Sequence, residues 1–253
     1  MYLTYLDSNS WFIEIGEQRI LLDPWLVGDL VFGNAPWFFI NKRNQERKIP
    51  ENIDLILLSQ GLEDHAHTPT LKQLDHNIPV VASPNAAKVV KELGYTKITT
   101  LAHGESFILA NQVEIKAVPG SPIGPTLVEN GYLIKDLQEN HSIYYEPHGY
   151  HSPSLKEDAP VDVVITPLTT IKIPLLGPVV KGGKSALEVS QLLKPQVMLP
   201  TAAGGDVEYG GLLNSLLQME GTLAQFKSML EENDLKTKVI EPKPGEQFEL
   251  KLS

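Results

Sequence analysis

The chain has 253 residues, with 42% apolar and 21% charged side chains, which is ordinary for a globular protein and too apolar for a disordered one. Acidic residues outnumber basic ones by 31 to 21, a formal net charge of −10 with no compensating basic run, so we expect neither nucleic acid nor an anionic membrane surface as partner. The absence of cysteine excludes disulfides and thiolate chemistry. No apolar run approaches the ~20 residues of a membrane span and no leader is evident, so we expect a cytoplasmic protein.

Short apolar runs bounded by turn residues predict the β-strands. The first three, with a turn at residues 16–18, predict an antiparallel meander, and the later ones predict strands buried on both faces of a sheet. The predicted strands are Tyr2–Leu6, Trp11–Ile15, Arg19–Leu22, Ile53–Leu58, Pro79–Ala82, Val113–Val118, Tyr132–Leu137, Ser142–Tyr145, Val161–Thr166 and Val197–Leu199.

Helix signals alternate with the later strands. A capping residue followed by proline predicts a helix from Thr68 to about Leu74 and another from Ser83 to Leu93. A capping box that begins at Ser185 predicts a third helix, and the apolar stripe within 221–233 predicts a fourth. Strands that alternate with helices predict an α/β fold of two packed sheets with helices outside, which we interpret as one domain over residues 1–253.

The most informative stretch follows the predicted strand Ile53–Leu58. This strand leads into a polar loop that contains Asp64, His65 and His67, and a capped helix follows. Loops at the carboxyl ends of strands commonly carry function. A carboxylate and imidazoles this close together suit Zn²⁺, Fe²⁺ or Mn²⁺, although the same residues also serve as a helix-capping and hydrogen-bonding cluster.

The order strand, Ser or Thr, His-x-His-x-Asp-His, helix is the first metal motif of the metallo-β-lactamase superfamily, and this loop resembles it. Asp64 and His65 match the motif, whereas Gln60 and Leu62 stand where its first two histidines should be. The resemblance implies a four-layer αβ/βα sandwich of two mixed sheets with helices outside. It also implies hydrolysis with two adjacent divalent ions, which lower the pKa of a bridging water.

Further landmarks carry the resemblance from Thr4 to about Gly205, closest to the branch of sugar-lactone and related simple hydrolases. An early strand ends in Asp-Pro-Trp, a strand pair stands where the family has Gly-Asp-Thr-Gly, and two core strands follow. These landmarks are residues 20–25, 128–134 with 143–149, 161–167 and 194–200.

The departures from the family pattern predict at most one metal. The third-motif histidine, expected near Ser121, is missing, and the last one falls on residues 201–203, Thr-Ala-Ala. The bridging aspartate position holds His148. Asp64, His65 and His148 are therefore the candidate catalytic residues and the candidate ligands of one zinc, iron or manganese ion. We expect their loops to meet at one end of the sheets, without a dinuclear site.

Three functions stay open. The first is hydrolysis of an unknown small molecule by a water bound to one metal, and the second is non-catalytic ligand binding or regulation on the scaffold without metal. The third is metal-free acid–base catalysis by the same three residues. The residues expected around the pocket are Gln60, Glu63, His67, Trp25, Glu146 and His151. Surface exposure is the simpler interpretation of Glu63 and Glu146, and a loop hydrogen bond that of His103 and His151.

Two apolar segments, Trp25–Ile40 and Ile171–Val180, lack strand or helix period and are interpreted as long loops. We expect them to converge as an apolar rim over the pocket, which would suit an apolar or aromatic ligand, or to form a homodimer interface. Residues 182–185, Gly-Gly-Lys-Ser, lack the first glycine of a phosphate loop. Lys184 could bind an anion at a helix start, but we interpret it as part of a solvated loop.

Overall fold

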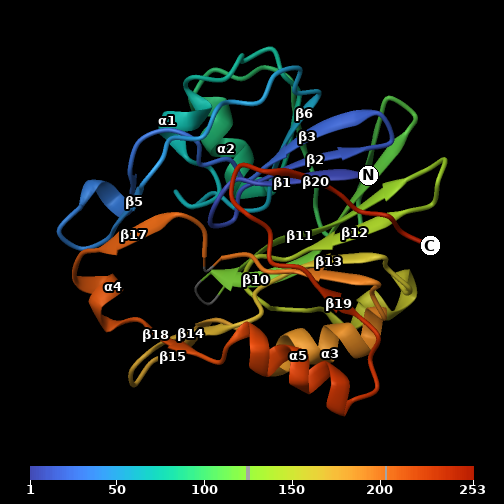
Figure 1. The fold of residues 1–253 in the computed structure, drawn as a ribbon. Helices are drawn as coiled ribbons and strands as arrows, with labels where there is room; N and C mark the ends of the chain where they lie inside the picture. Colours follow the sequence, from blue (N-terminus) through green and yellow to red (C-terminus); the bar gives the residue numbers. More distant parts are fainter. Residues whose placement is uncertain (124–125, 203) are drawn as a thin grey trace. The chain divides into compact units, whose positions relative to one another are not determined.

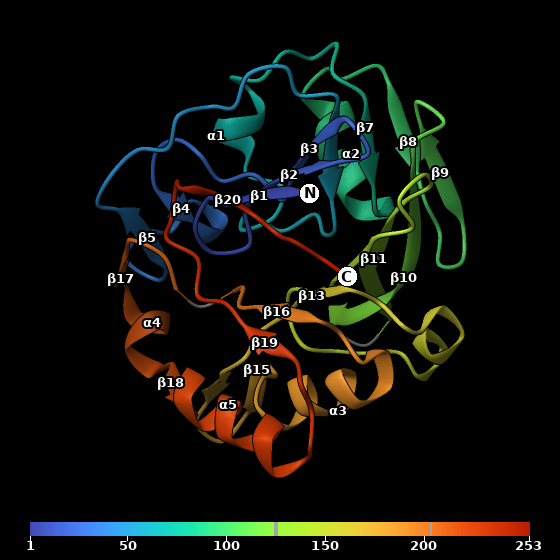
Figure 2. The same cartoon turned by 45° about the vertical axis from the view of Figure 1, so that its right-hand side comes forward.

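The computed structural model describes residues 1–123, 126–202 and 204–253, which form two compact units. Unit 1 comprises Met1–Ala102, Gly204–Leu216 and Pro242–Lys251, and unit 2 comprises His103–Ala203, Leu217–Glu241 and Leu252–Ser253. Each unit has its own seven-stranded mixed sheet (Figures 1 and 2). The predicted α/β class with two mixed sheets is therefore confirmed.

The sheet of unit 1 begins as the predicted meander. Its first three strands pair antiparallel in chain order. The turn between the second and the third, at Gly16 and Glu17, has φ values of 54° and 60°, as a two-residue hairpin requires. The last four strands run parallel. In spatial order the strands are β20 (Gln247–Glu249), β1 (Tyr2–Tyr5), β2 (Trp11–Ile15), β3 (Gln18–Leu22), β6 (Leu55–Leu58), β7 (Val80–Ala82) and β8 (Ile98–Thr100).

Helices α1 (Thr68–Leu71) and α2 (Pro84–Glu92) pack on this sheet. Alternate strand residues such as Ile56 and Leu58 share one buried cluster with Val90 of α2. Ser83 caps α2 as predicted, since its hydroxyl accepts the N–H of Ala86 at 3.4 Å. Helix α1 is shorter than predicted, and its N-cap is His67 rather than Thr68.

The sheet of unit 2 joins three antiparallel strands to four parallel ones. Strands β10 and β11 are longer than predicted, and their register shifts between Pro119 and Pro122. In spatial order the strands are β19 (Lys238–Val239), β16 (Val197–Leu199), β13 (Val163–Ile165), β12 (Ser142–Tyr145), β11 (Leu127–Asp136), β10 (Val113–Ile123) and β9 (Ser106–Leu109).

Helices α3 (Lys184–Leu193) and α5 (Leu223–Glu232) lie side by side and share a buried cluster with Tyr144 and Met198 of this sheet (Figures 1 and 2). The short helix η2 (Pro153–Asp158) follows β12. The predicted capping box of α3 is wrong. The N-cap is Gly183, which adopts φ 48°, and the Ser185 hydroxyl instead donates to the carbonyl of Gly149 at 2.5 Å.

The two apolar segments contain more regular structure than predicted. The first includes β4 (Leu30–Val31) and η1 (Phe32–Asn34) and reaches β5 (Ile40–Arg43), which pairs with β17 (Val207–Gly210) before α4 (Leu212–Leu216). The second is a hairpin rather than a loop. Its strands, β14 and β15, form a three-stranded sheet with β18, over Thr170–Ile173, Gly177–Val180 and Gln218–Glu220.

Their apolar side chains divide between core and surface. Trp25 is fully buried in a cluster with Leu30 and Phe39, whereas Trp37 is 72% exposed and Leu176 is 81% exposed. Because the two segments belong to different units, their convergence over a pocket stays a prediction.

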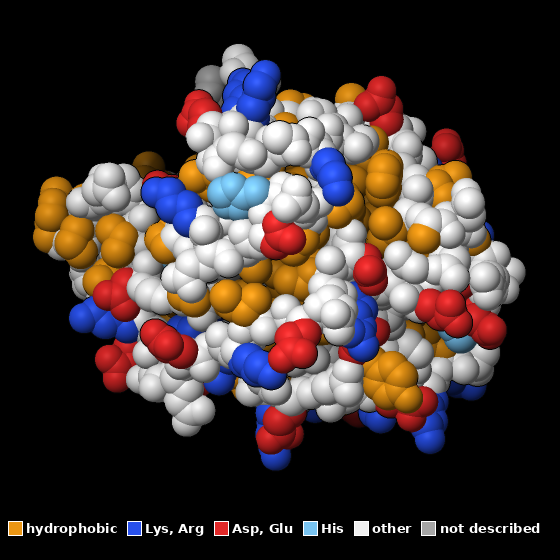
Figure 3. Space-filling view, turned by 90° about the horizontal axis from the view of Figure 1, so that it is seen from above, with side chains coloured by type: hydrophobic (Ala, Val, Ile, Leu, Met, Phe, Trp, Pro, Cys, Tyr) orange, Lys and Arg blue, Asp and Glu red, His pale blue; other side chains and the backbone are white. Residues whose placement is uncertain are grey.

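Charged side chains of both signs are interspersed over the face shown in Figure 3, which accords with the mixed composition. Within the described part of the chain, no helix is both long and apolar enough to cross a membrane.

Candidate metal centre

The loop after β6 places Asp64 and His65 at the end of the unit 1 sheet. Strand β6 is buried along its whole length and pairs in parallel with β3 and β7, so its carboxyl end is fixed from both sides. The backbone N–H of His65 donates to the carbonyl of Leu62 at 3.0 Å, which closes a tight turn. His65 is fully buried, and the side chain of Asp64 is 17% exposed.

A buried carboxylate from the neighbouring strand orients His65. Asp23 follows β3, is fully buried, and lies 2.7 Å from Nδ1 of His65. The same carboxylate accepts the N–H and the hydroxyl of Ser59, at 2.7 and 2.5 Å. A carboxylate that holds one ring nitrogen of a histidine is the usual arrangement behind a metal-binding imidazole. No local sequence pattern predicts this contact, although Asp23 lies at the end of a strand parallel to β6.

The other ring nitrogen of His65 faces Asp64. Nε2 lies 3.2 Å from Oδ2 of Asp64, and the amide nitrogen of Asn9 lies 3.4 Å from Nε2 and 3.3 Å from Oδ2. Two tetrahedral ligands of zinc, each about 2.0–2.1 Å from the ion, lie about 3.3 Å apart. The spacing of these two donor atoms therefore fits two ligands of one divalent ion.

The electrostatics of His65 follow from its two acidic neighbours. Burial lowers its pKa, but the carboxylates of Asp64 and Asp23 outweigh burial and raise that pKa to about 10. In the protein without metal, the ring is therefore a cation held between two carboxylates. An ion that binds Nε2 must displace this proton.

The other predicted pocket residues of unit 1 have structural contacts. His67 is 1% exposed, and its ring nitrogens lie 2.9 Å from the Thr70 hydroxyl and 3.2 Å from the carbonyl of Asp29. Burial lowers the pKa of His67 to about 4, so the ring is neutral. Glu63 is only partly exposed, because it accepts the N–H of Gly33 at 3.0 Å.

The two positions at which the family motif has its first histidines differ in burial. Gln60, which replaces the first histidine of the family motif, is fully buried, whereas Leu62, which replaces the second, is 37% exposed. The Nε1 of Trp25 donates to the carbonyl of Gly28 at 2.9 Å, and the guanidinium of Arg43 lies 4.0 Å from the centre of its ring.

In unit 2, the loop after β12 holds His148. Glu146 is fully buried, which corrects its predicted surface exposure: its carboxylate accepts the N–H groups of His148 and Tyr150, at 3.1 and 2.7 Å. The Nδ1 of His148 lies 3.1 Å from the hydroxyl of Ser121. The positions expected for the third motif and for the bridging aspartate thus meet within unit 2.

Close backbone packing holds this loop in place. A Cβ at Gly149 would collide with the carbonyl oxygen of Lys181, and Gly149 has φ 76°. Gly177 also has positive φ, 94°, but a Cβ there would meet nothing.

We expect Gly149→Ala to destabilise the protein more than Gly177→Ala. Gly177→Ala, the control, carries only the cost of holding alanine in the left-handed backbone region, about 1–2 kcal/mol. Gly149→Ala adds the cost of overpacking, about 1–3 kcal/mol. Denaturant unfolding of both variants measures the difference, and equal losses would contradict the close packing of these two loops.

The predicted meeting of Asp64 and His65 with His148 joins residues of different units and stays a prediction. The same holds for the pocket roles of Gln60, Glu63, His67, Trp25, Glu146 and His151. Of the three residues expected at the last histidine position, Ala203 lies outside the described residues.

Comparison with known proteins identifies the family. A model of the beta-lactamase superfamily domain matches residues 2–202. The chain belongs to this superfamily. The UPF0173 metal-dependent hydrolase of Pyrococcus furiosus is 26% identical, over 98% of this chain and 99% of that protein.

Solved structures show the same metallo-β-lactamase fold. The isothiocyanate hydrolase from Delia radicum gut bacteria superposes with a TM-score of 0.69 at 15% identity, covering 99% of both chains. Igni18, a metallo hydrolase from Ignicoccus hospitalis, superposes with a TM-score of 0.66 at 17% identity, also over 99% of both chains. The resemblance inferred from Asp64, His65 and the strand landmarks is therefore confirmed, and the superfamily's metal-dependent hydrolases make a divalent metal the expected cofactor.

Proposed function

We propose that the protein hydrolyses a small molecule with one divalent ion, held by Asp64 and His65 and completed by His148. The observation that carries this proposal is the spacing of 3.2 Å between Nε2 of His65 and Oδ2 of Asp64, with Asp23 behind the ring. When bound, such an ion lowers the pKa of a water and polarises the attacked group. The chain's own part is to orient the imidazole and to keep both donors together.

Membership of a superfamily of metal-dependent hydrolases supports the proposal, as does the similarity to the archaeal relative over nearly the whole of both chains. The replacement of two motif histidines by Gln60 and Leu62 supports one ion rather than two, because an ion needs three or four donors. We propose zinc, iron or manganese, since carboxylate and imidazole donors suit all three.

Metal content tests the proposal. Untagged protein is stripped with a chelator, titrated with Zn²⁺, Fe²⁺ under anaerobic conditions or Mn²⁺, and analysed for bound metal after dialysis. We expect one equivalent, which His65→Ala should abolish and His148→Ala should weaken. His141→Ala, at a partly exposed histidine just before β12, serves as control. Absence of stoichiometric metal would favour the alternative, a ligand-binding protein without metal, and two equivalents would contradict the single site.

Metal binding should release one proton. The carboxylates of Asp64 and Asp23 keep His65 protonated up to a pKa of about 10 in the metal-free protein. Because the ion requires the neutral ring, we expect its affinity to rise about tenfold per pH unit between pH 6 and 8. Calorimetry in two buffers of different ionisation enthalpy counts the proton. An affinity that is independent of pH would show that the ion does not bind Nε2 of His65.

A further inference from the structure

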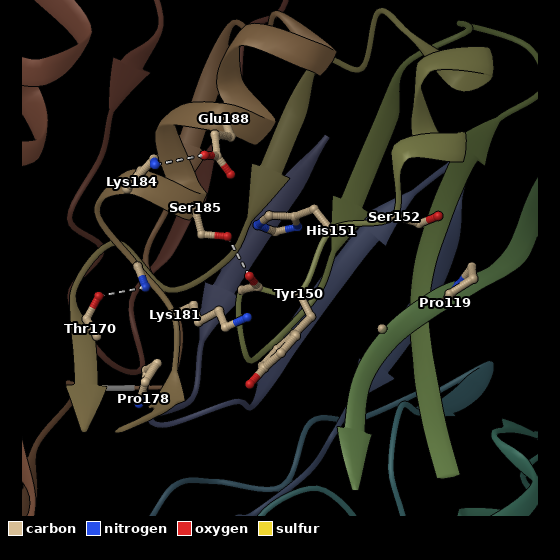
Figure 4. Close-up of a pocket in the computed structure, with 13 residues that line it drawn as sticks. Pro119, Tyr150, His151, Ser152, Thr170, Pro178, Lys181, Lys184, Ser185 and Glu188 are labelled. Carbon is tan, nitrogen blue, oxygen red and sulfur yellow. Dashed lines mark hydrogen bonds and ion pairs between the residues drawn. The ribbon is translucent and has the colours of Figure 1, made fainter. Parts of the chain in front are cut away.

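Unit 2 contains a pocket of about 590 Å³ that lies beside the His148 loop (Figure 4). Its walls come from residues 149–152 after β12, from the hairpin β14–β15, and from the first turn of α3. The polar and charged residues that line it include His151, Tyr150, Lys181, Lys184, Ser185 and Glu188.

Backbone contacts tie these walls together. The N–H of Lys181 donates to the carbonyl of His148 at 2.8 Å, and the N–H of Gly182 donates to the Thr170 hydroxyl at 3.1 Å. The hydroxyl of Ser185 donates to the carbonyl of Gly149 at 2.5 Å, as the dashed line in Figure 4 shows. A pocket whose walls are connected in this way is preformed and does not need a ligand to assemble it.

One wall presents a buried hydrogen-bond donor without an acceptor. The Nδ1 of His151 lies 3.1 Å from the hydroxyl of Tyr144, a fully buried side chain. Burial, with the charge of Glu146 adding to it, raises the pKa of Tyr144, so its hydroxyl keeps its proton. Because a buried hydroxyl must donate its proton, and Nδ1 is its partner among the described residues, Nδ1 is the acceptor.

The ring proton of His151 is therefore on Nε2. Burial, with the charge of Lys181 adding to it, lowers the pKa of His151 to about 3, so the ring is neutral and carries one proton only. Nε2 is buried and makes no hydrogen bond to the described residues. Since Nδ1 faces Tyr144, Nε2 lies at the opposite edge of the ring, which points toward Ser185 and the start of α3 (Figure 4). A buried N–H without an acceptor is costly unless a ligand supplies one.

Positive charge gathers at the same place. Lys181 is partly buried, stacks its ammonium 3.9 Å from the centre of the Tyr150 ring, and makes no ion pair among the described residues. Helix α3 points its N-terminus at the pocket and has no side-chain cap, because Gly183 occupies the capping position. The single carboxylate at the rim, Glu188, lies 3.8 Å from Lys184, and both are solvent-exposed.

We propose that this pocket binds an anionic oxygen group of a small ligand, a phosphate or a carboxylate. Nε2–H of His151, the ammonium of Lys181 and the start of α3 would contact it. Anion binding itself does not depend on a metal. That the bound anion is part of the hydrolysed molecule, which would then carry a negative charge, rests on the proposed function.

Calorimetry on the chelator-treated full chain tests the anion site without any metal. Inorganic phosphate and sodium acetate are titrated separately at constant ionic strength in sodium chloride, and the anion that binds more tightly identifies the source of the oxygen group. We expect a single site for that anion, and Lys181→Met to weaken it roughly tenfold or more, because a hydrogen bond to a charged group is lost. Lys227→Met, at an exposed lysine of α5, should leave affinity unchanged within about twofold. The proposal would be overturned if neither phosphate nor acetate binds, or if Lys181→Met and Lys227→Met lose the same anion affinity.

The tautomer of His151 gives a second readout that does not depend on a variant. Nitrogen-15 spectra of the histidine rings should show His151 neutral at pH 7 with its proton on Nε2, and addition of the anion should shift that resonance. A proton on Nδ1, or a resonance that saturating anion leaves unmoved, would remove His151 from the site. Because this test and the calorimetry use metal-free protein, failure here is distinguishable from failure of the metal centre.

Discussion

Asp23→Ala is expected to destabilise the protein by about 3–5 kcal/mol, the usual cost of removing one partner from a buried charged pair. The substitution leaves the His65 ring without the carboxylate at 2.7 Å. It also removes the acceptor of the Ser59 N–H and the closest partner of the Ser59 hydroxyl, whose other contact is Nδ1 of His65 at 3.3 Å. None of these groups is reached by water, because Asp23, Ser59 and His65 are fully buried. Denaturant unfolding of the metal-free protein at pH 7 measures the loss.

The milder variant Asp23→Asn separates the metal centre from stability. Asparagine keeps the shape of the side chain and one acceptor oxygen, but it cannot supply the charge that holds the ring of His65. We expect the affinity for the divalent ion to fall about 10–100-fold, as for other residues that orient a metal-bound histidine. Glu92→Gln, at the exposed end of α2, is the control and should change neither the free energy of unfolding nor the metal affinity. Unchanged metal affinity in Asp23→Asn would show that Asp23 supports the fold alone.

Glu146→Ala should be the second large loss. The carboxylate of Glu146 is fully buried and accepts the N–H groups of His148 and Tyr150. Each of the two donors left without an acceptor costs about 1–3 kcal/mol, so we expect a destabilisation of roughly 2–6 kcal/mol. The same change releases the loop that carries His148 and one wall of the anion pocket, so phosphate or acetate binding should weaken in parallel.

Glu146→Gln and Glu157→Ala are the control variants for the stability of Glu146→Ala. Glutamine retains one oxygen that can accept an N–H, so Glu146→Gln should lose less free energy of unfolding than Glu146→Ala. Glu157, an exposed carboxylate in η2 of the same unit, should be replaceable by alanine within about 0.5 kcal/mol. Equal stability of Glu146→Ala and Glu157→Ala would contradict the buried role of Glu146.

The sequence alone determined the class of the fold and the position of two candidate ligands. Strands such as Trp11–Ile15, Ser142–Tyr145 and Val197–Leu199 have the predicted bounds, because their periodicity and flanking turns are local properties of the chain. The helix after Ser83 starts as predicted for the same reason. Asp64 and His65 were found because a motif is contiguous in sequence.

Only the tertiary structure decided what surrounds those residues. Asp23 meets His65 across 42 positions because β3 and β6 are parallel neighbours, a pairing that no local pattern encodes. Glu146 is charged and lies beside a proline, which resembles a surface position, yet its carboxylate is buried because two backbone N–H groups donate to it.

The hairpin over 170–180 contains prolines that mask its strand pattern, and pairing with β18 stabilises it. The tautomer of His151 depends on Tyr144, whose hydroxyl only the folded chain brings to its ring. Each of these features is a contact between side chains or strands, and such contacts exist only after the chain has folded.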